Sequence, residues 1–436
     1  KSFMQKDIFR PFLNENIDVL NFLRYNTIGK NKERYFDFTA SGLAFRQIEN
    51  RIHEVLETYA NTHSKESSNA KTTTYYYERA RENLAKNFEL NDEFTVLPSG
   101  CGSTAAIKHF QELLGLYIPP ATKKRFGFKR DKKKAPLIIV GPYEHHSNEL
   151  SFRESLANVK RVKLTPDGLI DLKHLKKILE NNKDKEIIAS FCIASNVSGI
   201  ITPYKKISKL LRKYKAIVCF DAAASSPYIN IPCKYYDAMF VSSHKLLGGP
   251  SSCGLLIIKK SLIDTSLAPT FSGGGTVKYV NKDSQIYEDS IEAREDAGTP
   301  PIIQLIRASL AYQLRNEIGF EFIKQRKNEL LKYLLEELKT IPNLVIYGNQ
   351  EVENIGIVSF NIKGFNPYFL CEKLSNNGNF QTRAGCSCAG PYGHDLLGLK
   401  KISMKNRPGW LRVGVHFMQT KEDIKALVDE IKKSLL

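Results

Sequence analysis

The sequence has few of the features that mark membrane-spanning, exported or fibrous proteins. It has no unbroken apolar run long enough to cross a bilayer, and residues 1–20 lack the apolar stretch of a signal peptide. It also has no internal repeats and no extended low-complexity tract. The chain has 436 residues, 42% of them hydrophobic and 25% charged, which is ordinary globular composition for two or three domains.

Cysteine is scarce and scattered. The eight cysteines do not form a spaced framework, and several lie inside apolar runs, such as Cys192 in "IIASFCIAS" and Cys219 in "AIVCFD". Buried, unevenly spaced thiols are typical of a reducing compartment rather than of a disulfide-stapled secreted domain. We therefore expect reduced thiols and a cytoplasmic protein.

Acidic residues are outnumbered by basic ones, and the formal net charge is +18. Much of the excess lies in "KKRFGFKRDKKK" (residues 123–134), where eight of twelve residues are Lys or Arg. A basic loop can follow phosphates, but no nucleic-acid-binding motif accompanies this one. We interpret it as a solvated loop and expect no nucleic-acid partner, while the role of the segment stays open.

Buried strands alternate with an amphipathic helix in the middle of the chain. The helix is predicted in "TPYKKISKLLRKY", where one face carries Ile207, Leu210, Leu211 and Tyr214. Strand, helix and strand at this spacing predict an α/β domain with a mostly parallel central sheet sandwiched by helices. The predicted strands are apolar runs at 137–141, 186–193, 216–221, 238–243 and 254–259.

The character of the sequence changes after about residue 300, which predicts a second domain. A long helical region is followed by two strand-like runs, "NLVIYG" and "IGIVSFNI", and by a helix that begins at "TKED", a capping box. We predict a large α/β domain over 35–305 and a small C-terminal α+β domain over 306–436. Residues 1–34 are expected to pack back on the small domain.

Polar residues follow the predicted strands, where an open α/β sheet binds its ligands. Each one alone is also typical of a helix cap, a core histidine or a solvated lysine. Their recurrence at successive strand ends favours one shared site. A lysine, an acid, a histidine and a phosphate-binding helix N-terminus are the set that pyridoxal phosphate requires. The residues are "GST" (102–104), "EHH" (144–146), Asn196, Asp221 and Lys245.

From "YFDFTASG" near residue 35 to its end, the chain resembles the class V, fold-type I pyridoxal phosphate enzymes, within them the group II cysteine desulfurases and selenocysteine lyases. The resemblance makes Lys245 of "SSHKLLGGP" the residue that forms the Schiff base with the cofactor. Ser242 and His244 would then contact the phosphate. The phosphate-binding turn of the family matches Gly102, Ser103 and Thr104.

The same resemblance assigns the rest of the cofactor site. His145 would stack on the ring, Asn196 would lie near the substrate carboxylate and the ring oxygen, and Asp221 would pair with the pyridinium nitrogen. Thr299 of "DAGTP" would reach the phosphate in a neighbouring subunit, which implies a homodimer with shared sites. The family often has Gln where this chain has Ala224.

The stretch "RAGCSCAGP" resembles the nucleophile loop of group II desulfurases. The match makes Arg383 the clamp for the substrate carboxylate and Cys388 the nucleophile that takes the sulfur as a persulfide. Cys386 could relay the sulfur, protect Cys388 as a disulfide, or fill space. We expect no metal, because Cys386, Cys388 and His394 supply too few ligands.

The resemblance implies conversion of L-cysteine to L-alanine, with transfer of the sulfur to an acceptor protein. Selenocysteine or another amino acid is an open alternative substrate. Transamination, or C–S elimination without a persulfide, is an alternative reaction of the same family. The remaining alternative is a nucleic-acid-binding protein on an enzyme scaffold that has lost its activity. A degenerate scaffold would be expected to lose its cofactor-binding residues, whereas this chain keeps Lys245, Asp221 and His145.

Overall fold

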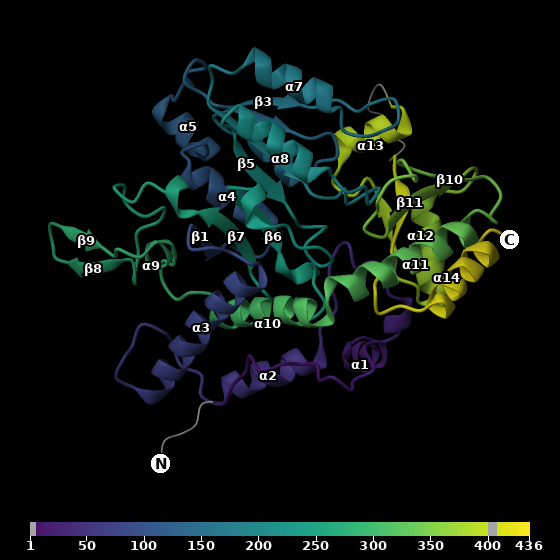
Figure 1. Cartoon of the computed structure of the whole chain (residues 1–436), viewed down its shortest axis with the longest axis horizontal. Helices are drawn as coiled ribbons and strands as arrows, with labels where there is room; N and C mark the ends of the chain where they lie inside the picture. The colour runs from purple at the N-terminus through teal and green to yellow at the C-terminus, as the bar shows by residue number, and fades with distance from the viewer. Residues whose placement is uncertain (1–5, 400–407) are drawn as a thin grey trace.

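A computed structural model describes residues 6–399 and 408–436, and its centre is a seven-stranded sheet (Figure 1). The strand order is β1-β7-β6-β5-β4-β2-β3. β2 to β6 run parallel, and β7 is antiparallel to both of its neighbours, β1 and β6. The strands are β1 (Phe94–Pro98), β2 (Leu137–Val140), β3 (Asn158–Arg161), β4 (Ile187–Cys192), β5 (Ile217–Asp221), β6 (Ala238–Ser242) and β7 (Gly254–Lys259).

Helices cover both faces of this sheet. Side chains alternate between the faces, so that Cys219 of β5 points toward one core, while Val218 and Phe220 point toward the other. The first face is covered by α4 (Ser103–Leu113) and α6 (His146–Arg153). The second is covered by α3 (Ser68–Asn87), α7 (Leu172–Asn181), α8 (Tyr204–Lys213) and α10 (Ile302–Ile318).

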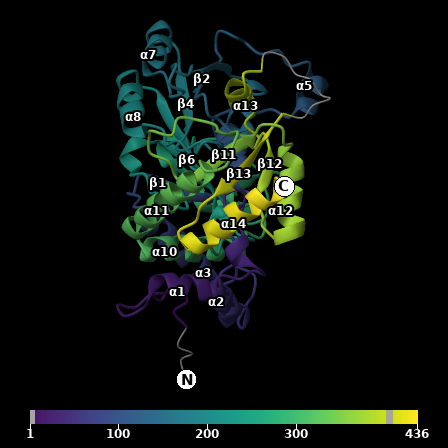
Figure 2. The same ribbon diagram turned by 90° about the vertical axis from the view of Figure 1, so that its right-hand side faces the viewer.

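A second, antiparallel sheet of four strands lies on the side of the molecule that faces the viewer in Figure 2. Three helices build a separate apolar core on it. The long helical region expected after residue 300 is broken at Gly319, whose φ of +90° no β-carbon-bearing residue adopts readily. The elements are β10 (Leu344–Ile346), β11 (Ile357–Ile362), β12 (Arg383–Gly385), β13 (Trp410–Gly414), α11 (Phe320–Leu338), α12 (Pro367–Gly378) and α14 (Lys421–Ser434).

The N-terminal segment contacts both parts of the molecule. In α1 (Val19–Asn26), Arg24 pairs with Asp423 at the start of α14 at 2.7 Å. The backbone N–H of Phe12 donates to Glu317 of α10 at 2.7 Å. Residues 1–5 of the predicted segment lie outside the described residues. The remaining helices are α2 (Arg46–Leu56), α5 (Pro120–Phe126), α9 (Ile291–Glu295), α13 (Gly390–Leu397) and the single turns η1 (Lys32–Arg34), η2 (Cys233–Tyr235), η3 (Ser243–Lys245) and η4 (Lys260–Leu262).

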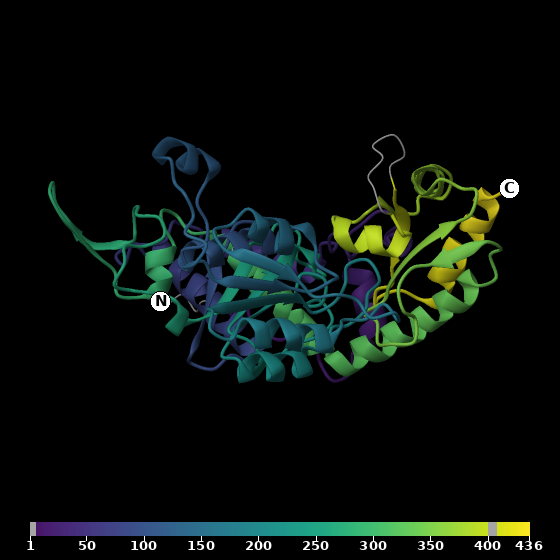
Figure 3. The same ribbon diagram turned by 90° about the horizontal axis from the view of Figure 1, so that it is seen from above.

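Two segments project from the body of the molecule. One is the hairpin of β8 (Val277–Val280) and β9 (Gln285–Tyr287), and the other is the basic segment 123–134, which begins in α5 (Figure 3). Most side chains of both segments are exposed. No helix in the described part of the chain has the length and apolar content needed to cross a membrane.

The predicted fold class is confirmed: the central sheet is mostly parallel and is sandwiched by helices. The predicted strands lie within one or two residues of the observed ones, and Thr420 and Asp423 form the predicted capping box. The boundaries 1–34, 35–305 and 306–436 stay a prediction about domains.

Candidate active site

A cavity of about 960 Å³ opens at the carboxyl ends of the parallel strands. Its wall also contains residues of the small sheet, Arg383 and Arg412, so both sheets contribute to one space. A narrow recess with Asp221 and Lys245 in its lining adjoins it. The predicted residues that line the cavity are Gly102, Ser103, Thr104, His145, Asn196, Ser242, His244, Lys245, Arg383 and Cys388.

Asp221 and Lys245 lie at the ends of two neighbouring segments of the central sheet. Asp221 ends β5, and Lys245 ends η3, directly after β6. Burial lowers the pKa of Lys245 to about 8, although the carboxylate of Asp221 opposes this shift. Burial raises the pKa of Asp221, although the Ala223 N–H donates to it at 3.0 Å and Lys245 lies near. A lysine with a lowered pKa can serve both as a nucleophile and as a base near neutral pH.

The N-terminus of α4 forms a cradle of donors. Gly102 precedes the helix without a side-chain cap of its own, and Gly102, Ser103 and Thr104 all line the cavity. The Ser103 N–H donates to Ser242 Oγ at 2.9 Å. A β-carbon on Gly102 would lie 3.2 Å from Ser242 Oγ and 3.5 Å from His244 Nε2, so a side chain there would narrow the cradle. Helix N–H groups, hydroxyls and an imidazole suit a phosphate.

His145 presents a neutral ring to the cavity. It is the N-cap of α6, and its Nδ1 accepts from the Ser147 N–H at 3.1 Å. Burial, with a smaller contribution from the charge of Lys245, lowers the pKa of His145 to about 4. A planar, uncharged imidazole is suited to stacking on an aromatic cofactor at physiological pH.

Asn196 lines the cavity and also contacts the loop that carries Cys388. Its Nδ2 donates to the Ser387 carbonyl at 2.7 Å, whereas its buried Oδ1 has no hydrogen-bond partner in the described part of the chain. The amide nitrogen carries two N–H donors, so one of them holds the loop that carries Cys388 while the other remains for a cofactor oxygen or a substrate carboxylate.

The cavity contains a second arginine that the sequence reasoning missed. Arg412 in β13 is almost fully buried, and its Nη1 donates to the Asn196 carbonyl at 3.1 Å. Arg383 in β12 is half-exposed and makes several contacts with Asp37, the shortest at 2.6 Å. Asp37 also lies 3.5 Å from Arg412. The only signal for Arg412 was a lone arginine inside the apolar run "WLRVGV".

The two cysteines of the predicted loop occupy different surroundings. Cys388 is exposed and lines the cavity. Cys386 is partly buried, and its Sγ lies 3.0 Å from the Pro408 carbonyl, within the core around Trp410. Burial raises the pKa of Cys386, which disfavours its thiolate. These surroundings favour the space-filling role among the three considered for Cys386.

Thr299 lies away from the cavity of its own chain. It is exposed, and its hydroxyl accepts from Asn61 Nδ2 at 3.0 Å. The segment before it includes the projecting β8–β9 hairpin, on which Tyr279, Val280 and Ile286 are more than half exposed. Thr299 is therefore not part of the cavity of its own chain, and its role stays a prediction.

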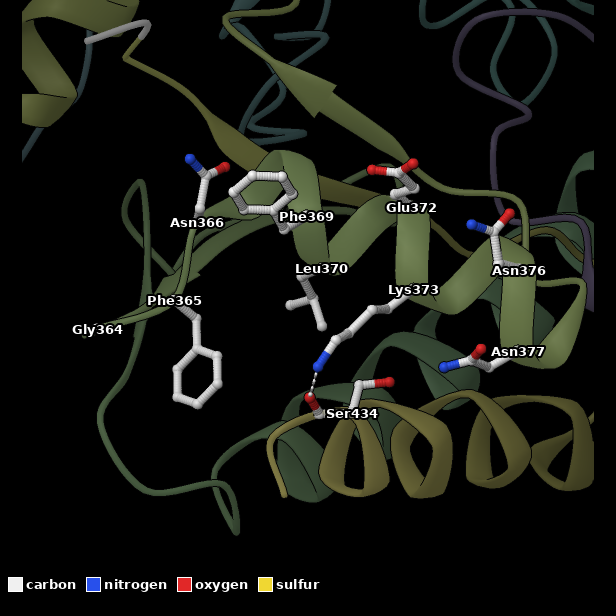
Figure 4. A pocket seen from close by; sticks show the side chains of 10 residues that line it. All are labelled: Gly364, Phe365, Asn366, Phe369, Leu370, Glu372, Lys373, Asn376, Asn377 and Ser434. Carbon is white, nitrogen blue, oxygen red and sulfur yellow. Dashed lines mark hydrogen bonds between the residues drawn. The ribbon is translucent and has the colours of Figure 1, made fainter.

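A second hollow, of about 490 Å³, lies on the small sheet's outer side between α12 and the end of α14 (Figure 4). Phe365 and Phe369 border it, and Lys373 Nζ donates to the Ser434 carbonyl at 3.2 Å across it. None of the predicted site residues lines this hollow.

Comparisons with known proteins agree with this architecture. A chain named probable cysteine desulfurase from Staphylococcus epidermidis is 28% identical over 408 residues, which cover 92% of this chain and 91% of that one. One of the same name from Streptomyces coelicolor is 27% identical and covers 91% of each chain.

Solved structures share the fold. The apo structure of a cysteine desulfurase from Thermococcus onnurineus superposes with a TM-score of 0.80 at 24% identity, covering 94% of this chain and 97% of that one. A cysteine desulfurase from Escherichia coli in an S-sulfonic acid form gives a TM-score of 0.77 at 22% identity, covering 96% and 99%. These neighbours confirm the predicted fold type I. A family model described as aminotransferase class-V matches residues 34–427. The chain therefore belongs to the aminotransferase class-V family of enzymes.

Proposed function

We propose that the protein is a pyridoxal phosphate-dependent cysteine desulfurase, which converts L-cysteine to L-alanine and leaves the sulfur as a persulfide on Cys388. The observation that carries the proposal is the convergence of Lys245, Asp221 and Cys388 on one site, although they come from distant parts of the chain. The names of the relatives from Staphylococcus epidermidis and Streptomyces coelicolor support it.

The residues present fit the cofactor. The cradle at the start of α4, with Ser242 and His244, would hold the phosphate. His145 would stack on the ring, Asp221 would face its nitrogen, and Lys245 would bind its aldehyde. When bound, pyridoxal phosphate supplies an electron sink for carbanion chemistry at the substrate.

Arg412 and Arg383 are proposed to hold the substrate carboxylate, since both line the cavity and a guanidinium binds a carboxylate through paired hydrogen bonds. Arg412 is the buried one, so its charge is less screened. Lys245 would take the proton from the substrate α-carbon. The thiolate of Cys388 would then attack the substrate sulfur: a new S–S bond forms, the C–S bond breaks, and its electron pair is protonated at carbon to give alanine.

We further propose a homodimer with shared sites. The position of Thr299 outside its own cavity supports it, and so do the exposed apolar side chains of the β8–β9 hairpin. The persulfide would pass to an acceptor protein. A cytoplasmic location fits the eight cysteines, all of which are free thiols.

One assay tests the reaction. The holoenzyme is incubated with L-cysteine, with and without a reductant, and the carbon product is identified. Alanine supports desulfuration. Pyruvate would show elimination, and a keto acid together with the aminated cofactor would show transamination; either result would replace the proposal.

A further inference from the structure

We infer that His146 is a positioning residue that holds the nucleophile in place: it fastens the Cys388 loop, residues 386–390, onto the N-terminus of α6. The inference rests on the proposed function only in taking Cys388 as the sulfur carrier. His145, the neighbour of His146, faces the cofactor cavity, whereas His146 faces the loop.

His146 makes two hydrogen bonds with the loop. Its backbone N–H donates to the Cys388 carbonyl at 2.7 Å. Its ring Nε2 accepts from the Gly390 N–H at 2.8 Å. Both bonds hold the chain directly after the Cys388 α-carbon, on either side of Ala389. Asn196 adds a third bond from the large sheet, to the Ser387 carbonyl at 2.7 Å.

The backbone of the loop needs such restraint. Ser387 and Cys388 both have left-handed conformations, with φ of +55° and +53°. Two consecutive residues with side chains in this region are unfavourable, because each β-carbon approaches the following carbonyl. External hydrogen bonds must offset this cost, so the loop conformation depends on the groups that hold it.

The contact between the His146 ring and Gly390 requires a residue without a side chain at position 390 and an unprotonated Nε2 on the ring. A β-carbon on Gly390 would lie 2.9 Å from His146 Nε2, so no larger residue fits without a shift. The ring can accept the Gly390 N–H only when Nε2 carries no proton. Burial lowers the pKa of His146, although Glu149 on the same helix opposes this shift, and the net direction favours the accepting form.

The position of the thiol over the cofactor therefore depends on the His146 ring. Loss of the ring acceptor leaves the Gly390 N–H without its partner and removes one of the bonds that hold the strained turn. The loop should then spend more time undocked, with the thiol of Cys388 away from the substrate. Substrate binding should not change, because Lys245, Asp221 and Arg412 remain.

The test compares the holoenzyme with two variants. His146→Ala removes the acceptor, whereas His146→Gln keeps an oxygen three bonds from the β-carbon, at the same reach as Nε2. Deuterium uptake is measured for a peptide that covers residues 386–393. We expect about fivefold faster exchange in His146→Ala, as the loss of one hydrogen bond predicts, and exchange within about twofold of the wild type in His146→Gln.

Steady-state alanine release provides a second readout. We expect His146→Ala to lower kcat about fivefold with KM for L-cysteine nearly unchanged, since the loop acts after substrate binding. His146→Gln should recover most of kcat. Unchanged exchange in His146→Ala, or equal acceleration in both variants, would overturn the inference.

Two further comparisons keep the outcomes separate. Gly390→Ala disturbs the same contact from the loop, because the added β-carbon would crowd the His146 ring. It should accelerate deuterium exchange as His146→Ala does. In the double variant, the two effects should not add. If His146→Ala fails to fold, Gly390→Ala alone decides, and normal exchange in it would refute the inference. If the wild type releases no alanine, the proposed function fails, while the exchange result still judges the docking of the loop.

Discussion

Arg412→Gln is the substitution that most directly tests the substrate site. Arg412 is almost fully buried in β13, and burial lowers the pKa of its guanidinium. Asp37 keeps its contacts with Arg383 when Arg412 is replaced, so the change does not leave a buried carboxylate without a partner. Gln reaches only as far as the arginine Nε, so the substitution removes the guanidinium together with the Nη1 bond to the Asn196 carbonyl.

The size of the effect follows from burial. A charge-assisted hydrogen bond in a sheltered site contributes about 1.5–3 kcal/mol, which predicts a loss of roughly 10- to 150-fold in kcat/KM for L-cysteine. Arg383 has 52% of its side chain exposed and already binds Asp37. Screening by solvent limits its contribution to about 1 kcal/mol, so Arg383→Gln should cost no more than about fivefold.

The assay is steady-state alanine release over a range of L-cysteine concentrations, with cofactor content measured by absorbance. Most of the loss in Arg412→Gln should appear in KM, because the guanidinium binds a group that does not react. Arg412→Lys serves as a matched control that keeps the charge but loses the paired geometry. A larger loss in Arg383→Gln than in Arg412→Gln would refute the reasoning and restore Arg383 as the principal clamp.

Three further predictions concern the cofactor, the pH response and the assembly. Lys245→Ala should lose the visible absorbance band of the attached cofactor and all turnover. Asp221→Ala should bind the cofactor weakly and lose activity by orders of magnitude. Near-normal spectra and rates in either variant would contradict the proposed cofactor site. His145 has a pKa near 4 when folded, so between pH 6.5 and 4 only the unfolded chain binds its proton and stability falls as pH falls. His145→Gln should reduce this loss by on the order of 1 kcal/mol at pH 5 in denaturant titrations of the apoprotein, and an identical pH response would refute the assignment. Mixing Lys245→Ala with Thr299→Val protomers should give hybrids more active than either parent, whereas a fully active monomer in sedimentation would exclude shared sites.

The parts of the fold that could be predicted from the sequence are the strands that are buried on both faces of the central sheet. Parallel strands covered on both faces, such as β4 and β5, are continuous apolar runs in the sequence. The ends of these strands could therefore be located in the sequence. Asp221 and the turn that carries Lys245 were found because they lie at such strand ends. The β8–β9 hairpin was not found, because its strands are exposed and lack that pattern.

The small sheet shows where sequence reasoning reached its limit. β13 is a five-residue strand, and the arginine in its centre is buried only because Asp37 and the Asn196 carbonyl come from distant parts of the chain. Nothing local distinguishes such an arginine from a surface one. The role of His146 was hidden in the same way, since its partner Gly390 lies more than two hundred residues later.

The central claim is that Cys388 carries the sulfur, and mass spectrometry after reaction with L-cysteine tests it most directly. The wild type and Cys386→Ser should each gain one sulfur atom on the peptide that contains Cys388, and both should release alanine. Cys388→Ser should gain none and release little alanine, although it still binds the substrate. A persulfide on Cys386 in the wild type, or undiminished alanine release by Cys388→Ser, would contradict the account.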